Sequence, residues 1–408
     1  MNAVRRAPWP RVTSPTSPFA KSLNFFVFQE TLFMSPVCAL RRFMLGSMTA
    51  ALLLGGVAHA QLRIGQPSGF TGSVAAGVKE NTDGALLYID AVNARGGVNG
   101  QKIELISVDD KFDPQVTVEV ARQLITEQKV LALFLNRGTP HAQALLPLLA
   151  QYQVPLVGPS TGAMVLHEPV NPWVFNVRAT YQREASKAIE HLVSIGITRI
   201  AVLQTDDSFG ADSAAGAQKG FDQVGQKPLL LIKFPRDKPD FAAPAKEVAA
   251  AQAQAVMVIG SAGNTANAVK ALRAAGSRAQ VVTLSNNASA GFIKLLGEHA
   301  RGVIVTQVFP NERRIASPLI KEARELAKAK GLEDISPAMM EGYAAAKVLV
   351  EGLRRAGPKP TPNGLRNALE GISNFDIGGL TVSYSATNHT GLEFADLSII
   401  DDQGRFRR

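Results

Sequence analysis

The chain has 408 residues, 46% of them hydrophobic and 19% charged, so it can fill the cores of about two or three domains, and we expect most of it to be folded. Its formal charge of +9 would suit a nucleic-acid binder, but residues 1–60 hold six Lys/Arg and one acid, which leaves +4 for the rest. The remaining cations are dispersed among acidic residues without clusters, and this pattern argues against a nucleic-acid interface.

The first sixty residues have the composition of an export signal. Arg41 and Arg42 precede an apolar run over residues 43–57, and Ala58-His59-Ala60 follows. A positive segment, a short apolar core and a small-x-small site are typical of a secretory signal peptide. The apolar run is shorter than the roughly 20 residues that a membrane span needs, although a single membrane anchor is the alternative. We predict cleavage after Ala60 and a mature protein without a stable membrane anchor.

Short apolar runs then alternate with longer amphipathic stretches, in two successive series. The first series predicts strands at 62–66, 102–108, 130–135 and 155–157, with helices at 74–94, 114–128 and 140–152. The second predicts strands at 199–204, 228–234, 255–259, 280–284 and 303–308, with helices at 181–195, 208–224, 241–253 and 265–275. Strands separated by helices indicate parallel sheets covered on both faces, so the sequence predicts an α/β protein with two lobes.

The tail departs from this alternation. It predicts helices at 318–330, 337–357 and 362–369, followed by strands at 380–383 and 393–400. We therefore expect one lobe to collect the late helices and the other to collect the final strands, with chain crossings near Arg178, Phe309 and Gly378. The predicted division is residues 1–60 as leader, 61–178 plus 309–376 as the first lobe, and 179–308 plus 377–408 as the second. Three crossings predict a hinge.

The loops that follow the predicted strands are rich in Gly, Ser, Thr and Asn. Ligands of open α/β sheets bind beyond the carboxyl ends of the strands, and helix starts there offer free backbone N–H groups to an anion. The alternative is that these side chains only cap helices. The candidate ligand-binding residues of these loops are Phe70, Asn136, Arg137, Thr139, Ser160, Thr161, Gly162, Phe209, Ser261, Asn264 and Asn286.

Catalytic and metal sites are not indicated. The five histidines after residue 60 are scattered, and the single cysteine, Cys38, precedes the predicted cut. The sequence contains no phosphate-binding Gly-rich Lys motif. We predict that the chain is not an enzyme and uses no cofactor or metal; an exported enzyme is the distant alternative.

Several segments carry a resemblance to a known family. The most specific is Ile89-Asp90-Ala91-Val92-Asn93-Ala94-Arg95-Gly96-Gly97-Val98-Asn99-Gly100, followed by Val108-Asp109-Asp110; Phe175-Asn176-Val177-Arg178 and Glu341-Gly342-Tyr343 also fit. From about Leu62 to its end the chain resembles the branched-chain amino acid (leucine/isoleucine/valine) binding proteins of ABC transporters, which are type I periplasmic binding proteins. The resemblance implies two doubly wound parallel-sheet lobes joined by a three-crossover hinge, a periplasmic location, a small-molecule solute and ABC permease subunits as partners.

The resemblance also implies roles at the site. It places the carboxylate of the ligand on Thr139, Ser160, Thr161 and Gly162, and it matches Phe209 to an aromatic residue of the second lobe. Members that bind amino acids pair the ligand's ammonium with an acidic residue of the second lobe, whereas the matching segment here, Ser285-Asn286-Asn287, has none. A buried ammonium without such a partner costs several kcal/mol.

The missing acid favours a carboxylic acid that lacks a free α-amino group, with Arg137 and Arg183 as candidate partners of the acid. Two alternatives stay open: a receptor for branched-chain or other amino acids, and a sensory binding protein that feeds a signalling receptor.

Overall fold

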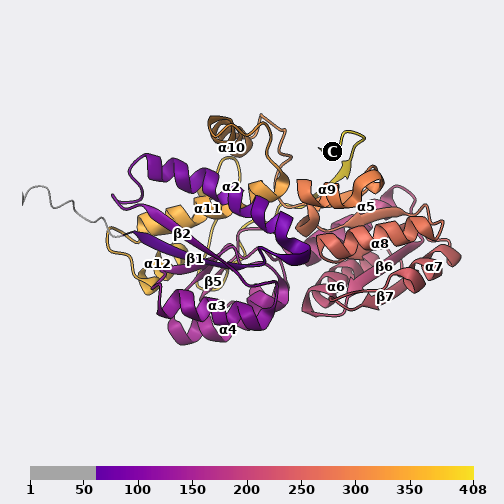
Figure 1. Ribbon diagram of the computed structural model, residues 1–408, viewed down its shortest axis with the longest axis horizontal. Coiled ribbons are helices and arrows are strands. Elements are labelled where there is room, and N and C mark those ends of the chain that lie inside the picture. Colours follow the sequence, from indigo (N-terminus) through magenta and orange to yellow (C-terminus); the bar gives the residue numbers. More distant parts are fainter. Residues whose placement is uncertain (1–60) are drawn as a thin grey trace, which may run out of the picture. The chain divides into compact units, whose positions relative to one another are not determined.

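The computed structural model describes residues 61–408 (Figure 1). The predicted signal peptide, its cleavage site and Cys38 lie outside the described residues. Within residues 61–408, no helix is both long and apolar enough to cross a bilayer.

The first sheet has five parallel strands in the order β2-β1-β3-β4-β5. At one edge of the sheet, β1 pairs with β2 in the register that sets Leu62 beside Ile103. Alternate strand residues feed opposite faces, as a pleated strand requires: Phe134 and Phe175 pack on one side, Leu133 and Leu156 on the other. The strands are β1 (Leu62–Ser68), β2 (Ile103–Asp109), β3 (Ala132–Phe134), β4 (Leu156–Val157) and β5 (Val174–Phe175).

Helices cover both faces of this sheet (Figure 1). One face holds α2 (Ala75–Ala94), α10 (Pro318–Ala329), α11 (Pro337–Arg355) and α12 (Pro362–Glu370); the other holds α3 (Pro114–Thr126) and α4 (Thr139–Tyr152). Gly342 of α11 allows the closest approach to α2, because a Cβ there would lie 1.8 Å from the main-chain oxygen of Asn81. The late helices of the chain therefore pack with the first lobe.

The second sheet has seven strands in the order β14-β13-β10-β9-β8-β6-β7. The strands are β6 (Ile200–Thr205), β7 (Leu230–Phe234), β8 (Ala255–Ile259), β9 (Gln280–Thr283), β10 (Ile304–Gln307), β13 (Asp396–Ile400) and β14 (Phe406–Arg407). In this sheet β13 runs antiparallel to both of its neighbours, β10 and β14, and the other strand pairs are parallel. One face packs on α5 (Tyr181–Ser194) and α6 (Ser208–Gln223), and the other on α7 (Ala242–Ala250), α8 (Ala262–Ala274) and α9 (Ala290–Leu296). The prediction of two doubly wound lobes is confirmed.

The third crossing between the lobes differs from the sequence prediction. Residues 377–392, which we assigned to the second lobe, pack in the first: Ile377, Val382 and Leu392 belong to its core, and the Tyr384 hydroxyl donates to the Asn176 oxygen at 2.6 Å. The predicted strand at 380–383 is half of a hairpin of β11 (Phe375–Asp376) and β12 (Thr381–Val382). Burial of these apolar side chains holds residues 377–392 in the first lobe, so the chain crosses to the second lobe after Leu392. The alternation of apolar and polar residues in a strand does not reveal which lobe buries it.

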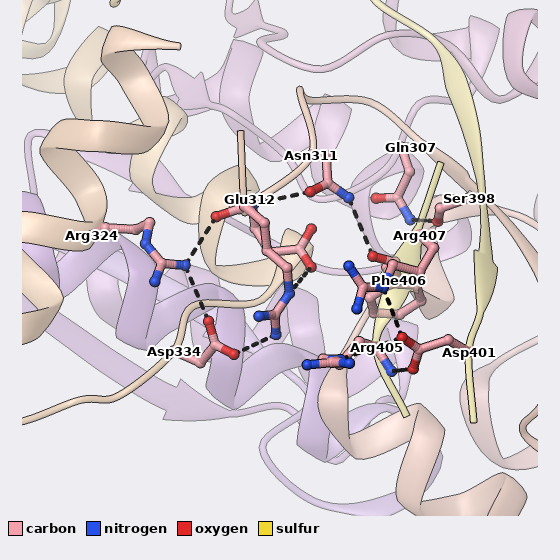
Figure 2. A network of polar contacts seen from close by, with 11 residues as sticks. Gln307, Asn311, Glu312, Arg324, Asp334, Ser398, Asp401, Arg405, Phe406 and Arg407 are labelled. Atoms are coloured by element: carbon pink, nitrogen blue, oxygen red, sulfur yellow. Dashed lines mark hydrogen bonds and ion pairs between the residues drawn. The ribbon is translucent and has the colours of Figure 1, made fainter. Parts of the chain in front are cut away.

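A polar network surrounds the second crossing, where the chain leaves β10 (Figure 2). Arg313 and Arg324 both pair with Asp334, and the Asn311 amide donates to the Phe406 oxygen at 3.3 Å. Glu312, between them, is only 3% exposed. These bonds tie the crossing segment to both the first-lobe helices and the final strand of the second lobe.

Candidate functional site

A narrow cavity of about 20 Å³ lies between the carboxyl ends of the two sheets. That volume admits about one water molecule, so the lobes are closed on it. A larger hollow of about 590 Å³ lies over α10, remote from the strand ends, so position and not size identifies the site. The cavity is lined from the first lobe by Val74, Phe112, Arg137, Gly138 and Thr139, and from the second by Tyr181, Thr205, Phe209, Arg236, Ser261, Asn264 and Asn286.

Arg137 is the central cation of this cavity. It follows β3, and the next residue, Gly138, has a φ of 99° that favours glycine and turns the chain into α4. The guanidinium is 6% exposed; its Nη1 donates to the Ser160 hydroxyl at 3.0 Å and its Nη2 to the Asn286 main-chain oxygen at 2.5 Å. Among residues 61–408, no carboxylate forms an ion pair with Arg137. The buried charge is therefore bound only by neutral oxygens.

Behind Arg137 lies a layer of hydroxyl groups. Thr139, which lines the cavity, shares a hydrogen bond of 2.7 Å with Thr161. The Ser160 hydroxyl also accepts from the Asn81 amide at 3.1 Å. Gly162 packs so tightly that a Cβ would lie 2.5 Å from the Ala179 oxygen. The predicted residues Ser160, Thr161 and Gly162 thus do not line the closed cavity; the first two hold its arginine and threonine in place.

Two further predicted residues also lie outside the lining. The Asn136 amide donates to the Pro67 oxygen at 3.0 Å, and the Phe70 N–H donates to Asp109 at 2.8 Å. The first bond fixes the end of β1 and the second fixes the loop that follows it. Arg183 pairs with Glu393 at 3.6 Å with half of its side chain exposed, and it is not a lining residue.

A second arginine of the cavity, Arg236, is not among the residues predicted from the sequence. Arg236 follows β7 and forms an ion pair with Asp207 at 2.5 Å. Its guanidinium carbon lies 5.0 Å from the centre of the Phe112 ring, in the first lobe, and that ring stacks on His141 at 4.3 Å. A cation over an aromatic face is attracted to it, so this contact joins the lobes. The strand-end rule points to Arg236 and Phe112 as well, since both follow predicted strands.

His141 adds no charge to this stack. Burial is the main cause that lowers its pKa to about 4, so the ring is neutral near pH 7. Neither ring nitrogen has a hydrogen-bond partner in the described part of the chain. The two arginines are therefore the cations of the site.

Tyr181 and Phe209 form the aromatic wall of the second lobe. Their rings meet edge to face at 5.0 Å, and the guanidinium of Arg178 lies 4.5 Å from the centre of the Tyr181 ring. Burial is the main cause that raises the pKa of the Tyr181 hydroxyl, so it stays protonated. The sequence predicted Phe209 here but not Tyr181, which begins α5 directly after the first crossing.

The remaining second-lobe candidates line the cavity and also support it. The Ser261 hydroxyl caps α8 by accepting from the Asn264 N–H at 3.3 Å, while the amide of Asn264 donates to the Arg236 oxygen at 2.9 Å. Asn286 donates to the Gly260 oxygen at 3.0 Å, and its buried Oδ1 has no hydrogen-bond partner among residues 61–408. Capping and cavity lining are thus compatible roles for one residue.

The charge of the site follows from its carboxylates. None of the twelve lining residues is acidic. The carboxylate beside them is Asp207, which accepts from the Gly210 N–H at 2.9 Å and the Thr205 hydroxyl at 3.3 Å in addition to its pair with Arg236. Arg137 is left as the unbalanced charge, and the cavity is suited to an anion. Within residues 61–408, no three His, Cys, Asp or Glu side chains gather as metal ligands.

A buried ion pair lies beneath this wall, at the first crossing. Arg178 pairs with Glu184 and lies 3.7 Å from Glu341, while Glu184 also accepts from the Ser285 N–H at 2.9 Å. Burial opposes the charge of Arg178, but the two carboxylates outweigh it and raise its pKa. The pair connects the first lobe to the segment that carries Asn286.

The sequence and the fold both match known proteins. Residues 61–399 match the family model described as periplasmic binding protein. A substrate-binding periplasmic protein from Ralstonia solanacearum has 32% sequence identity and a TM-score of 0.79, with 85% of this chain and 99% of that chain covered.

Two further relatives are more distant. The Leu/Ile/Val-binding protein homolog 3 of Brucella melitensis is 23% identical over 88% of this chain and 97% of its own length. A fatty acid ABC transporter substrate-binding protein from Thermomonospora curvata shares the fold, with 20% identity, a TM-score of 0.77 and coverage of 86% and 91%. The matched family consists of binding proteins that are not enzymes, in agreement with the prediction from sequence. The chain belongs to the periplasmic binding protein family.

Proposed function

We propose that this protein is the receptor of an ABC importer and captures a carboxylic acid without a free α-amino group by closing its two lobes. The observation that carries the proposal is Arg137: a buried guanidinium without an acidic partner among the described residues, in a cavity without an acidic lining residue. A ligand carboxylate would supply the missing anion in a charge-assisted bond.

The surroundings of Arg137 suit a carboxylate. Thr139 offers a hydroxyl and begins α4, whose first N–H groups favour negative charge. The apolar remainder of the ligand would face Val74, Phe112 and Phe209. The closed cavity is small, so the acid enters the open form and the lobes then adjust around it.

An amino acid is the rival ligand, because the Brucella relative is named a Leu/Ile/Val-binding protein homolog. Its ammonium would need a carboxylate, and Asp207 is already bound by Arg236, Gly210 and Thr205. The Thermomonospora protein, by its name, takes a fatty acid, which has a carboxylate and no ammonium, and serves an ABC transporter. The chemistry of the cleft favours the second class.

Calorimetric titration tests the ligand class. Protein exported by a bacterial host is unfolded and refolded to remove any co-purified solute, then titrated with benzoate, phenylacetate, hexanoate, leucine and valine. We expect one of the acids to bind and its uncharged amide to bind at least about a hundredfold more weakly, because the pair with Arg137 is lost. Tight binding of leucine or valine would contradict the proposal.

The transport role needs its own measurement. Uptake of the radiolabelled acid that binds best is compared in cells of the source bacterium with and without this chain. We expect uptake to fall when the chain is absent and to return with the wild-type protein but not with an Arg137→Met variant. Unchanged uptake with a strong binder would leave binding intact and reject the importer role.

A further inference from the structure

A second set of contacts joins the lobes outside the cavity. Glu80 of α2, in the first lobe, accepts hydrogen bonds from the N–H groups of Ala290 at 3.0 Å and Gly291 at 2.7 Å, which begin α9 in the second lobe. The N–H of Ala338, at the start of α11, donates to the Ala288 oxygen at 3.0 Å. Each bond pairs one lobe with the other, so each depends on closure.

Backbone packing at the same place is equally close. A Cβ on Gly291 would lie 2.3 Å from the Cβ of Ala76, a distance that side chains do not tolerate. Nearby, a Cβ on Gly263 of α8 would lie 3.2 Å from that of Ser73. Glycine at position 291 is therefore what allows α9 of the second lobe to meet α2 of the first, whereas the contact at Gly263 is close enough to be bridged by a pair of side chains.

This contact is continuous with the cavity. Asn286, whose oxygen accepts from Arg137, lies on the same segment as Ala288 and Gly291. Asn287 anchors that segment to the second sheet, because its amide donates to the Gly260 oxygen at 3.1 Å and the Thr283 hydroxyl at 2.9 Å. The segment 286–291 is thus fixed to the second lobe, and it contacts both Arg137 and Glu80 of the first lobe.

We propose that Glu80, together with the close contact of Ala76 and Gly291, is a closure latch: these residues do not touch the solute but position the second lobe for its capture. The inference rests on the proposed closure mechanism and deepens it. Opening the lobes returns the Glu80 carboxylate and the two N–H groups to water, so the latch biases the equilibrium between open and closed forms. A contact made only in the closed form changes affinity in proportion to that bias.

The test measures closure without any solute. Ser73→Cys and Gly263→Cys are introduced with Cys38→Ser, and the rate of disulfide formation under mild oxidation is followed on non-reducing gels. Two cysteines can be joined when their Cβ atoms are about 3.5–4.5 Å apart, close to the present geometry. The cross-linking rate therefore reports how often the lobes close.

Three changes to the latch give distinct expectations. Glu80→Ala should slow cross-linking about tenfold, because two charge-assisted bonds are lost, and Glu80→Gln should slow it less. Gly291→Ala should slow it at least tenfold by collision with Ala76, and the double change Ala76→Gly/Gly291→Ala should return the rate to within about threefold of the parent. Glu119→Gln, which changes an exposed residue of α3, is the matched control and should leave the rate unchanged.

Each outcome decides the proposal. Parent-like rates in both Glu80→Ala and Gly291→Ala would overturn it, and so would failure of Ala76→Gly to rescue Gly291→Ala. Absence of cross-linking in the parent would show that the lobes do not meet here, which also rejects the latch. Because no acid is added, these results are independent of the ligand class. Thermal unfolding of each variant separates a lost latch from a lost fold: a latch variant keeps the midpoint of the parent.

Discussion

Arg137 and Asn286 are joined across the cleft by a hydrogen bond of 2.5 Å from the guanidinium Nη2 to the main-chain oxygen. The donor belongs to the first lobe and the acceptor to the second. Arg137, which we propose as the partner of the ligand's carboxylate, therefore also makes a bond that exists only when the lobes are closed. A side chain that binds the solute and the opposite lobe together couples capture to hinge motion.

Replacing Arg137 by Met tests the anion site. We expect the affinity for the best-binding acid to fall at least about a hundredfold, because a buried charge-assisted pair is lost, and Arg137→Lys to lie between. Titration calorimetry measures both. Arg183→Met is the matched control, since Arg183 is exposed and pairs with Glu393, and it should bind as the wild type does. Equal affinities for Arg137→Met and Arg183→Met would remove Arg137 from the site.

An acid placed in the second lobe should reverse the preference of the cleft. Ser261 lines the cavity and caps α8, and aspartate caps a helix as well as serine does, so Ser261→Asp adds a carboxylate without loss of the cap. We expect acid binding to weaken about tenfold or more through repulsion, while leucine does not lose affinity. Ser261→Asn, which is neutral and also caps, is the comparison. If both variants weaken acid binding equally, charge is not the cause.

The carboxyl of Glu312 should make the fold sensitive to pH. Its pKa rises from 4.5 to about 7, chiefly through burial, with Asp334 acting in the same direction and Arg313 in the opposite one. The folded chain therefore holds this proton more tightly than the unfolded chain does. Its contribution to stability is complete below pH 4.5 and is lost as the pH rises to about 7, by about 3 kcal/mol.

Glu312→Gln replaces this titrating carboxyl by a neutral amide, so its contribution to the pH dependence of stability is lost. Urea unfolding at about pH 5, 6, 7 and 8 should show a smaller fall in the free energy of unfolding for the variant than for the wild type. Glu333→Gln, which changes an exposed carboxylate next to the same network, serves as control. Parallel curves for wild type and Glu312→Gln would show that Glu312 titrates normally.

The buried pair of Arg178 and Glu184 should carry a large share of stability. Glu184 is fully buried and also accepts from the Ser285 N–H at 2.9 Å. Glu184→Ala leaves the guanidinium buried without its main partner, so the free energy of unfolding should fall by about 3–5 kcal/mol. Chemical denaturation measures the change, and Glu119→Ala on the surface should cost less than about 0.5 kcal/mol. A small loss for Glu184→Ala would mean that Glu341 takes over the charge.

The short motif Glu341-Gly342-Tyr343 has a physical reason in the fold. Glu341 lies by Arg178, Gly342 allows α11 to meet α2, and Tyr343 is buried edge to face with Tyr88 at 5.5 Å. Three adjacent residues thus serve three different contacts of one helix. A different neighbour restricts the residue type at each of the three positions. For that reason even a motif of three residues is informative about the fold.

Periodicity and neighbours along the chain were enough to predict the two α/β series, most of their elements and the strand ends at which Arg137, Thr139 and Ser261 lie. These features are local, because a strand or an amphipathic helix repeats its pattern within a few residues. Tertiary packing alone places Ser160 and Thr161 behind the cavity, sets Arg236 against Phe112 of the other lobe, and keeps residues 377–392 with the first lobe. Those outcomes depend on which apolar surfaces of distant segments pack against one another, and the local sequence pattern does not contain that information.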